Sequence, residues 1–170
     1  MMLAETDYTN LALDLALRDS AGAHDMLMEQ LRRIENPDRR ERFSFLLPAV
    51  SVDALERKRW FSALADSANR RHEKWVLDGL RYLHHPLRTQ ASQALVKPSL
   101  ELLREIQQTG DIFFPKGWLD ATLGGYNSPE VAKTVREFLQ SRPADYPVRL
   151  KNLSLQSADE LFHAADIVRP

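Results

Sequence analysis

Hydrophobic residues recur every three or four positions along almost the whole chain, which is the spacing of one face of an α-helix. Alternation of apolar and polar residues, typical of a half-buried strand, is almost absent. The stripes, in chain order, are Tyr8, Leu11 and Leu15; Leu27, Leu31 and Ile34; Phe43, Leu46, Leu47 and Val50; Trp60, Phe61, Leu64 and Ala68; Val76, Leu80 and Leu83; Leu100, Leu103 and Ile106; Trp118 and Leu119; Val131, Val135, Phe138 and Leu139; and Leu161, Ala165 and Val168. The pattern predicts an all-α protein.

Capping signals mark the starts of several of these helices. A Ser or Asn side chain there can accept a hydrogen bond from a free N–H group of the first turn. The predicted caps are Asn36, Ser51, Ser128 and Ser157, the last forming a capping box with Glu160. Asn36 and Ser128 each precede a proline at the first helical position, which strengthens the prediction.

The helices are short, and so are their connections. About nine or ten such helices favour successive antiparallel hairpins over one four-helix bundle. No sequence repeats at a fixed period, and no low-complexity linker divides the chain. We therefore predict one helical domain over residues 1–170, an α-α superhelix of the HEAT/ARM-like kind.

Composition narrows the classes of partner. The formal net charge is -1 with 28% charged residues of both signs, so we expect neither a nucleic acid nor an anionic membrane as partner. The absence of cysteine excludes thiol catalysis and cysteine-based zinc sites. No apolar run reaches the length of a membrane span, and the first ten residues lack the pattern of a signal peptide. We therefore expect no targeting signal within these residues, and the sequence leaves the location of the protein unknown.

The stretch RRHEKWV, residues 70–76, begins like the zinc-binding helix of a metallopeptidase. Such a helix needs H-E-x-x-H, because two imidazoles four residues apart can bind one cation. Here Val76 stands at the position of the second histidine. The next histidine, His84, would lie roughly 18 Å away along a continuous helix. We interpret His72 as a residue at the edge of a helix interface and Glu73 as a solvated charge.

Other charged motifs also have structural explanations. His84 and His85 stand at a helix end, where the helix dipole favours positive charge, so they are predicted to form a C-terminal cap. Arginine pairs at 32–33, 39–40 and 70–71 are interleaved with glutamates, which predicts a solvated, salt-bridged face. No nucleophile-elbow, phosphate-loop or dinucleotide-binding motif occurs. We therefore predict no catalytic residue, no metal ligand and no cofactor in this chain.

The segment TGDIFFPKGW, residues 109–118, places two Phe and one Trp between two predicted helices. Loops run over the surface, so aromatic rings there either pack into the domain or contact a partner. If they pack internally, Asp111 caps the turn, and Pro115 with Lys116 begins the next helix. If they contact a partner, the segment is a domain-docking or cavity loop. Its candidate residues are Asp111, Phe113, Phe114, Lys116 and Trp118.

Four segments together carry a resemblance to a known family. They are RFSFLLPAVS (42–51), RHEKWVLDGLRYLHHPLR (71–88), SLELLREIQQTGDIFFPKGWL (99–119) and VREFLQSRPADYPVRLKNLSLQSADELF (135–162). The series resembles the C-terminal helical domain of the gluzincin zinc aminopeptidases, the aminopeptidase N family. The resemblance spans roughly residues 11–168, and residues 109–118 carry most of it.

The resemblance implies a function without catalysis. Family members have a β domain, a thermolysin-like catalytic domain and an α-superhelical C-terminal domain that closes over the active site. The zinc motif H-E-x-x-H and the G-x-M-E-N motif belong to other domains, so RRHEKWV is a coincidence. The implied cofactor, zinc, belongs to the parent enzyme. The implied partner is the catalytic domain of the same polypeptide, and the chain, as its C-terminal part, would contact peptide substrate indirectly.

Two other functions fit parts of the sequence. A freestanding helical-repeat scaffold could bind a protein or peptide on a concave face. A standalone hydrolase could use His72 and Glu73, and metal analysis would test it. The reading frame upstream of Met1 separates the first two ideas, because only a parent aminopeptidase should encode H-E-x-x-H and G-x-M-E-N there.

Overall fold

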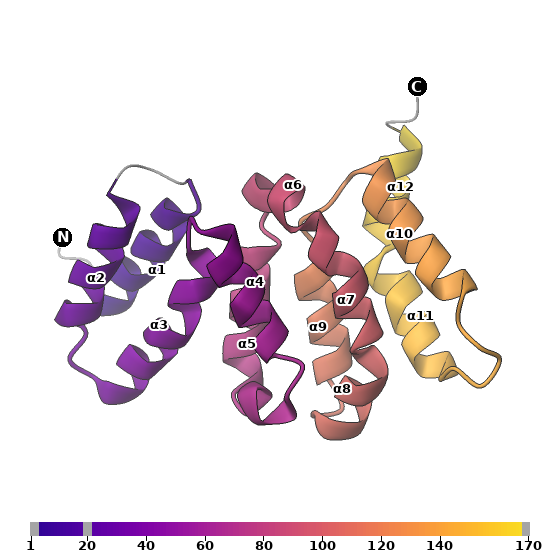
Figure 1. Cartoon of the computed structure of the whole chain (residues 1–170), viewed down its shortest axis with the longest axis horizontal. Coiled ribbons are helices and arrows are strands. Elements are labelled where there is room, and N and C mark those ends of the chain that lie inside the picture. The colour runs from indigo at the N-terminus through magenta and orange to yellow at the C-terminus, as the bar shows by residue number, and fades with distance from the viewer. Residues whose placement is uncertain (1–3, 19–21, 168–170) are drawn as a thin grey trace. The chain divides into compact units, whose positions relative to one another are not determined.

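The structure is a computed structural model that describes residues 4–18 and 22–167. Every regular element in these residues is a helix, which confirms the predicted all-α class (Figure 1). By its internal contacts the chain divides into two compact units, Met1–Ala63 and Leu64–Pro170. The superhelix and the single domain over residues 1–170 stay predictions. Among the described residues, no helix combines the length and hydrophobicity needed to cross a membrane.

The first unit consists of two helical hairpins. Its helices are α1 (Glu5–Ala16), α2 (Ala23–Arg33), α3 (Pro37–Val50) and α4 (Ala54–Ala63). Helix α1 packs on α2, α3 packs on both of them, and α4 packs on α3. Large apolar side chains fill the space between the helices, among them Leu13, Ile34, Phe43 and Leu46, which are at most 1% exposed. This packing gives the unit a core of its own.

The second unit is built around one central helix. Its elements are η1 (Ser67–Arg70), α5 (Glu73–Leu83), η2 (Pro86–Arg88), α6 (Thr89–Ser92), η3 (Gln93–Leu95), α7 (Val96–Glu101), α8 (Leu103–Thr109), α9 (Phe114–Leu123), α10 (Pro129–Gln140), α11 (Val148–Ser157) and α12 (Asp159–Ile167). Helix α9 contacts α5, α7, α8 and α11. Its Trp118 is fully buried and donates a hydrogen bond from Nε1 to the Ser99 carbonyl at 3.1 Å.

Two of the predicted caps are confirmed. The Asn36 side chain accepts a hydrogen bond from the Arg39 backbone N–H at 3.0 Å and starts α3. Ser128 Oγ accepts one from the Val131 N–H at 3.3 Å and starts α10. In both cases a proline follows the cap, as expected from its missing N–H and fixed φ.

The predicted cap at Ser51 is wrong. Helix α4 begins two residues later than that cap requires, and Asp53 Oδ1 accepts the hydrogen bond from the Leu55 N–H at 2.8 Å. Ser51 Oγ instead accepts one from the Asp53 N–H at 3.1 Å. The far end differs as well, because α4 ends at Ala63 and the predicted stripe position Ala68 lies exposed in η1.

The predicted capping box at Ser157 is also wrong, because Ser157 is the last residue of α11, which the pattern did not reveal. Its hydroxyl donates a hydrogen bond to Asp120 Oδ1 at 2.7 Å. The buried face of α11 includes a serine, Ser154, whose hydroxyl bonds the Leu150 carbonyl at 2.8 Å, while Leu155 is exposed. With a polar residue on the buried face and an apolar residue on the exposed face, the helical spacing of hydrophobic residues in α11 is not visible in the sequence.

The first predicted stripe does not face the core. Tyr8 and Leu11 are 46% and 48% exposed, and Leu15 is half-buried. The buried residues of α1 are instead Thr9, Ala12, Leu13 and Ala16. Three of these four side chains are small, which allows the backbones of α1 and α2 to approach closely. Val168, assigned to the last stripe, lies outside the described residues.

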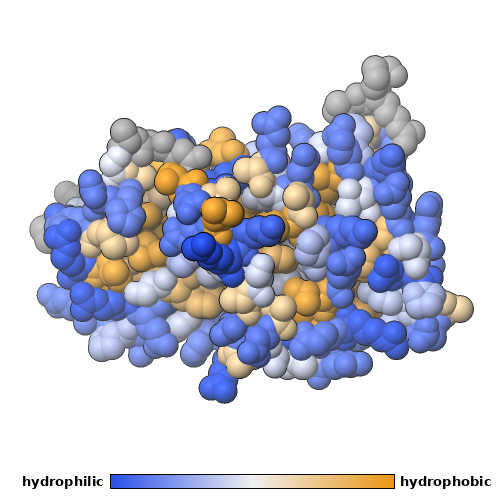
Figure 2. All heavy atoms as spheres, in the orientation of Figure 1, coloured by the Kyte–Doolittle hydropathy of each residue, from blue (hydrophilic) through white to orange (hydrophobic). Residues whose placement is uncertain are grey.

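Hydrophilic residues cover most of the face shown in Figure 2, with hydrophobic ones between them.

Candidate functional site

The turn between α8 and α9, residues 110–113, is held by its own hydrogen bonds and by α5. Asp111 Oδ1 accepts a hydrogen bond from the Phe113 N–H at 2.9 Å, which confirms that Asp111 caps the turn. The Asp111 N–H donates to Glu73 Oε1 at 2.7 Å. Glu73 is therefore not simply a solvated charge, as its position after His72 suggested. It joins the first turn of α5 to this loop.

The three aromatic rings of residues 109–118 have different environments. Phe114 and Trp118 are 2% and 0% exposed and pack edge to face, with ring centroids 5.9 Å apart. Phe113 is 78% exposed. Lys116 pairs with Asp120 one turn further on, with 2.6 Å from Nζ to Oδ2. Of the three candidate anchors, Phe113 alone has a ring that a partner could cover, because the other two belong to the core.

The exposed part of the segment is a small apolar tip formed by Ile112 and Phe113, here called the Phe113 tip. Ile112 is 58% exposed, and its carbonyl accepts a hydrogen bond from Arg149 Nη2 of α11 at 2.9 Å. Sequence reasoning missed Arg149 because it did not predict α11. The tip is thus attached to α5 on one side and to α11 on the other.

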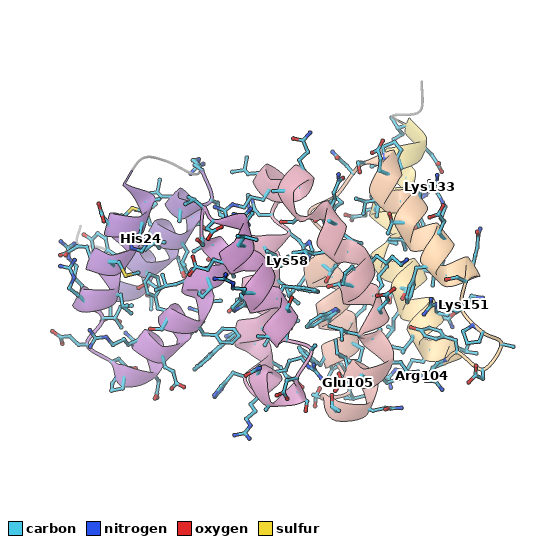
Figure 3. The ribbon with its side chains drawn as sticks, in the orientation of Figure 1. His24, Lys58, Arg104, Glu105, Lys133 and Lys151 are labelled. Atoms are coloured by element: carbon cyan, nitrogen blue, oxygen red, sulfur yellow. The ribbon has the colours of Figure 1, made fainter. Side chains whose placement is uncertain are left out.

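Arg70, a buried arginine, lies beside this turn and is 3% exposed. It donates hydrogen bonds to the carbonyls of Leu64 and Ala65, the latter at 3.3 Å, and to Thr109 Oγ1 at 3.0 Å, and it forms an ion pair with Glu105. Figure 3 labels Glu105, which lies on α8. The expectation that this arginine belongs to a solvated face is wrong. The short helix η1 directs its side chain inward, where backbone carbonyls satisfy it.

A cavity of about 350 Å³ adjoins this arginine. Charges of both signs line it, including Arg71 and Glu73, together with Gly110 of the turn. His72 stands at the N-cap position of α5, and its ring stacks on Trp75 with 4.0 Å between centroids. Within residues 4–18 and 22–167, no three side chains of the metal-ligand types form a group that could hold an ion.

The histidine pair at the end of α5 differs from the expected cap. His84 is 1% exposed, and its Nδ1 shares a hydrogen bond with the Tyr126 hydroxyl at 2.7 Å. Burial lowers the pKa of His84 to about 3, so the ring is neutral and cannot complement the helix dipole by charge. His85 Nδ1 accepts a hydrogen bond from the Leu87 N–H at 3.2 Å and caps η2.

Because His84 is buried and neutral, the stability of the chain is expected to fall in mild acid. The pKa is about 3 in the folded state against an ordinary value of 6.5, so the unfolded chain binds one more proton between these values. Stability from this residue is complete above pH 6.5 and is lost as the pH falls towards 3. At pH 5 the free energy of unfolding should be about 2 kcal/mol lower than at pH 7.5 on account of this residue.

Urea denaturation at a series of pH values measures this effect, and His84→Gln is the reference. The variant keeps a polar side chain but has no imidazole to titrate, so its curve should be flatter by about 1.2 kcal/mol per pH unit between pH 5 and 6. Parallel curves for the two proteins would show that His84 does not remain neutral in the folded state.

Searches of family models, curated proteins and solved structures find no match to this chain.

Proposed function

We propose that this chain is the C-terminal helical domain of a zinc-dependent aminopeptidase, where it closes and shapes the peptide-binding cavity of a catalytic domain in the same polypeptide. The resemblance of the four quoted segments motivates the proposal. The structural observation that carries it is the Phe113 tip, which lies within the segment with the strongest resemblance. A surface aromatic ring with 78% exposure is the kind of residue that another domain covers.

The tip is preorganised for docking. Its turn is fixed by the Asp111 side chain, by Glu73 of α5 and by Arg149 of α11. A rigid anchor loses little conformational freedom when it binds, so more of its buried apolar area contributes to affinity. Aromatic residues often carry the largest share of the free energy at an interface.

The role of the domain is steric and indirect. A helical wall beside a catalytic centre excludes bulk water and limits which peptides enter, and its polar surface contacts the distal part of a substrate. The zinc ion of the parent enzyme would activate water for hydrolysis of the N-terminal residue. No residue of this chain takes part in that step.

The first test is the reading frame that encodes the chain. It should contain H-E-x-x-H and G-x-M-E-N upstream of the codon for Met1. A stop codon or an unrelated domain in that position would remove the proposal in favour of a freestanding scaffold.

Replacing Phe113 by Ala should separate docking from folding. In the 170-residue chain the free energy of unfolding should change by less than about 0.5 kcal/mol, because the ring is mostly in solvent. In the full-length enzyme the loss of an interface anchor should weaken docking by about 2 kcal/mol and lower kcat/KM for an aminoacyl-nitroanilide. Urea denaturation and steady-state kinetics measure the two effects.

Phe114→Ala is the matched control, since it removes the same ring one position away. This ring is buried, so its loss should destabilise both the isolated chain and the full-length enzyme by about 3 to 5 kcal/mol. If Phe113→Ala destabilised the isolated chain as much as Phe114→Ala, or left turnover by the full-length enzyme unchanged, the Phe113 tip would not be a docking anchor.

A further inference from the structure

Helix α1 is apolar on two faces. Its inner face, with Ala12 and Leu13, packs within the first unit. Its outer face carries Tyr8, Leu11 and Leu15, at intervals of three and four residues, so these side chains form one continuous stripe. Tyr8 is 46% and Leu11 48% exposed. A helix that ended a packed layer would have a polar outer face instead.

The stripe borders a shallow groove between α1 and α2. We call it the α1 groove and define it by Tyr8, Leu11, Leu15 and Met26, which line a hollow of about 160 Å³. Gln30, which also lines it, is already satisfied, because its Nε2 donates to Thr9 Oγ1 at 3.1 Å. Glu29 and Arg33 of α2 also line the groove and pair with each other, so its apolar surface lies along α1 and at Met26, whose flexible side chain can adapt to an incoming one.

The flank of the groove along α1 is acidic. Helix α1 contains Glu5, Asp7 and Asp14 and neither Lys nor Arg. Glu5 pairs with Arg39 at 3.0 Å, whereas Asp7 and Asp14 have no cationic partner among the described residues. Each of these two aspartates directly precedes a residue of the stripe. On the α2 side, Glu29 already binds two arginines of its own helix.

We infer that the α1 groove is covered by an amphipathic helix with a basic flank, which the same polypeptide supplies from outside residues 1–170. The stripe has the period of a helix laid along α1, and Lys or Arg on the flank of that helix would face Asp7 and Asp14. In stacked hairpins only a terminal layer needs a polar outer face. The apolar outer face of α1 is therefore typical of a helix that has a further layer of helices packed on it.

The same charges argue against other occupants. In a symmetric pair of copies, α1 would lie against α1, and the aspartates of the two copies would repel one another. An anionic lipid surface would meet the same repulsion. The source of the helix rests on the proposed function, which places the chain in a longer polypeptide, whereas its chemistry rests on the groove alone.

Thiol labelling can test coverage, because the chain has no cysteine. In Leu11→Cys the new thiol should react quickly with a maleimide in the 170-residue chain. In the full-length polypeptide it should react at least about tenfold more slowly, because the covering helix must first open. Leu55→Cys, at a 62% exposed position of α4, is the control and should react at the same rate in both proteins. Equal rates for Leu11→Cys in the two proteins would overturn the inference.

A synthetic probe tests the chemistry of the groove. A peptide of about four helical turns, with leucines on one face and lysines along one flank, should bind the chain, whereas its glutamate counterpart should not. Asp14→Lys should weaken binding of the lysine peptide. No binding, equal binding of both peptides, or self-association of the chain in sedimentation would contradict the inference. The full-length protein could protect Leu11→Cys although its reading frame lacks H-E-x-x-H. That result would uphold the inference about the covering helix, whereas the proposed function would fail.

Discussion

Replacing Arg70 by Ala is expected to lower the free energy of unfolding of the chain by about 3 kcal/mol. The substitution would leave the buried carbonyl of Leu64 without its donor and would also remove the part-buried hydrogen bonds to the Ala65 carbonyl and the Thr109 hydroxyl. Glu105 would lose its ion pair, but its side chain is 41% exposed and can turn to water. The unpaired backbone groups therefore account for most of the loss.

Arg71→Ala is the matched control for Arg70→Ala. It removes the same side chain from the next position, where the residue is exposed. Surface substitutions of this kind change stability by less than about 0.5 kcal/mol. Urea denaturation of the two variants at one pH makes the comparison, and equal stabilities would show that Arg70 does not hold η1 against α8.

Gly125→Ala is expected to destabilise the chain by about 3 kcal/mol or more, enough to reduce the yield of folded protein. A Cβ atom at this position would lie 1.9 Å from the carbonyl oxygen of His84. That atom belongs to the backbone at the end of α5 and cannot rotate away. The chain around Tyr126 would have to move, and its hydrogen bond to His84 would be strained or lost.

Gly117→Ala, in the interior of α9, should behave differently. The nearest atom to its Cβ would be Leu77 Cδ1 at 2.7 Å, at the end of a flexible side chain. Alanine also favours a helix over glycine by about 1 kcal/mol, which offsets the adjustment of the leucine. Thermal unfolding of both variants should therefore give a large loss at Gly125 and a small change at Gly117. Similar losses of stability at both sites would show that the backbone contact of Gly125 with the His84 carbonyl is not what makes this position intolerant of alanine.

The sequence predicted best those helices whose apolar residues are large and face one way. In α5, Val76, Leu80 and Leu83 were expected in the core and are fully buried. In α1 the same reasoning chose Tyr8 and Leu11, because hydrophobicity alone does not distinguish a face that packs within the unit from one that another segment can cover. Alanines bury less area than leucines, yet they permit closer helix packing, and no periodicity reveals that preference.

The candidate site shows a second limit of sequence reasoning. Phe113 and Phe114 are identical neighbours, but one precedes α9 and points to solvent while the other lies in its first turn and is buried. The sequence alone did not distinguish the two rings, and both were candidate anchors of a docking loop. The contacts of Arg70 and Arg149 were also beyond prediction, because their partners lie far away in the sequence and one of them depends on the unpredicted helix α11.

The long-range polar contacts around the Phe113 tip have a consequence for the order of folding. The pairs Arg70–Thr109, Glu73–Asp111 and Arg149–Ile112 are separated by 39, 38 and 37 residues. Closing loops of this length costs chain entropy before any of these bonds can form, whereas the helical hairpins form from near neighbours. We therefore expect the contacts that fix the tip to form after the transition state, so that weakening them should accelerate unfolding more than it slows refolding.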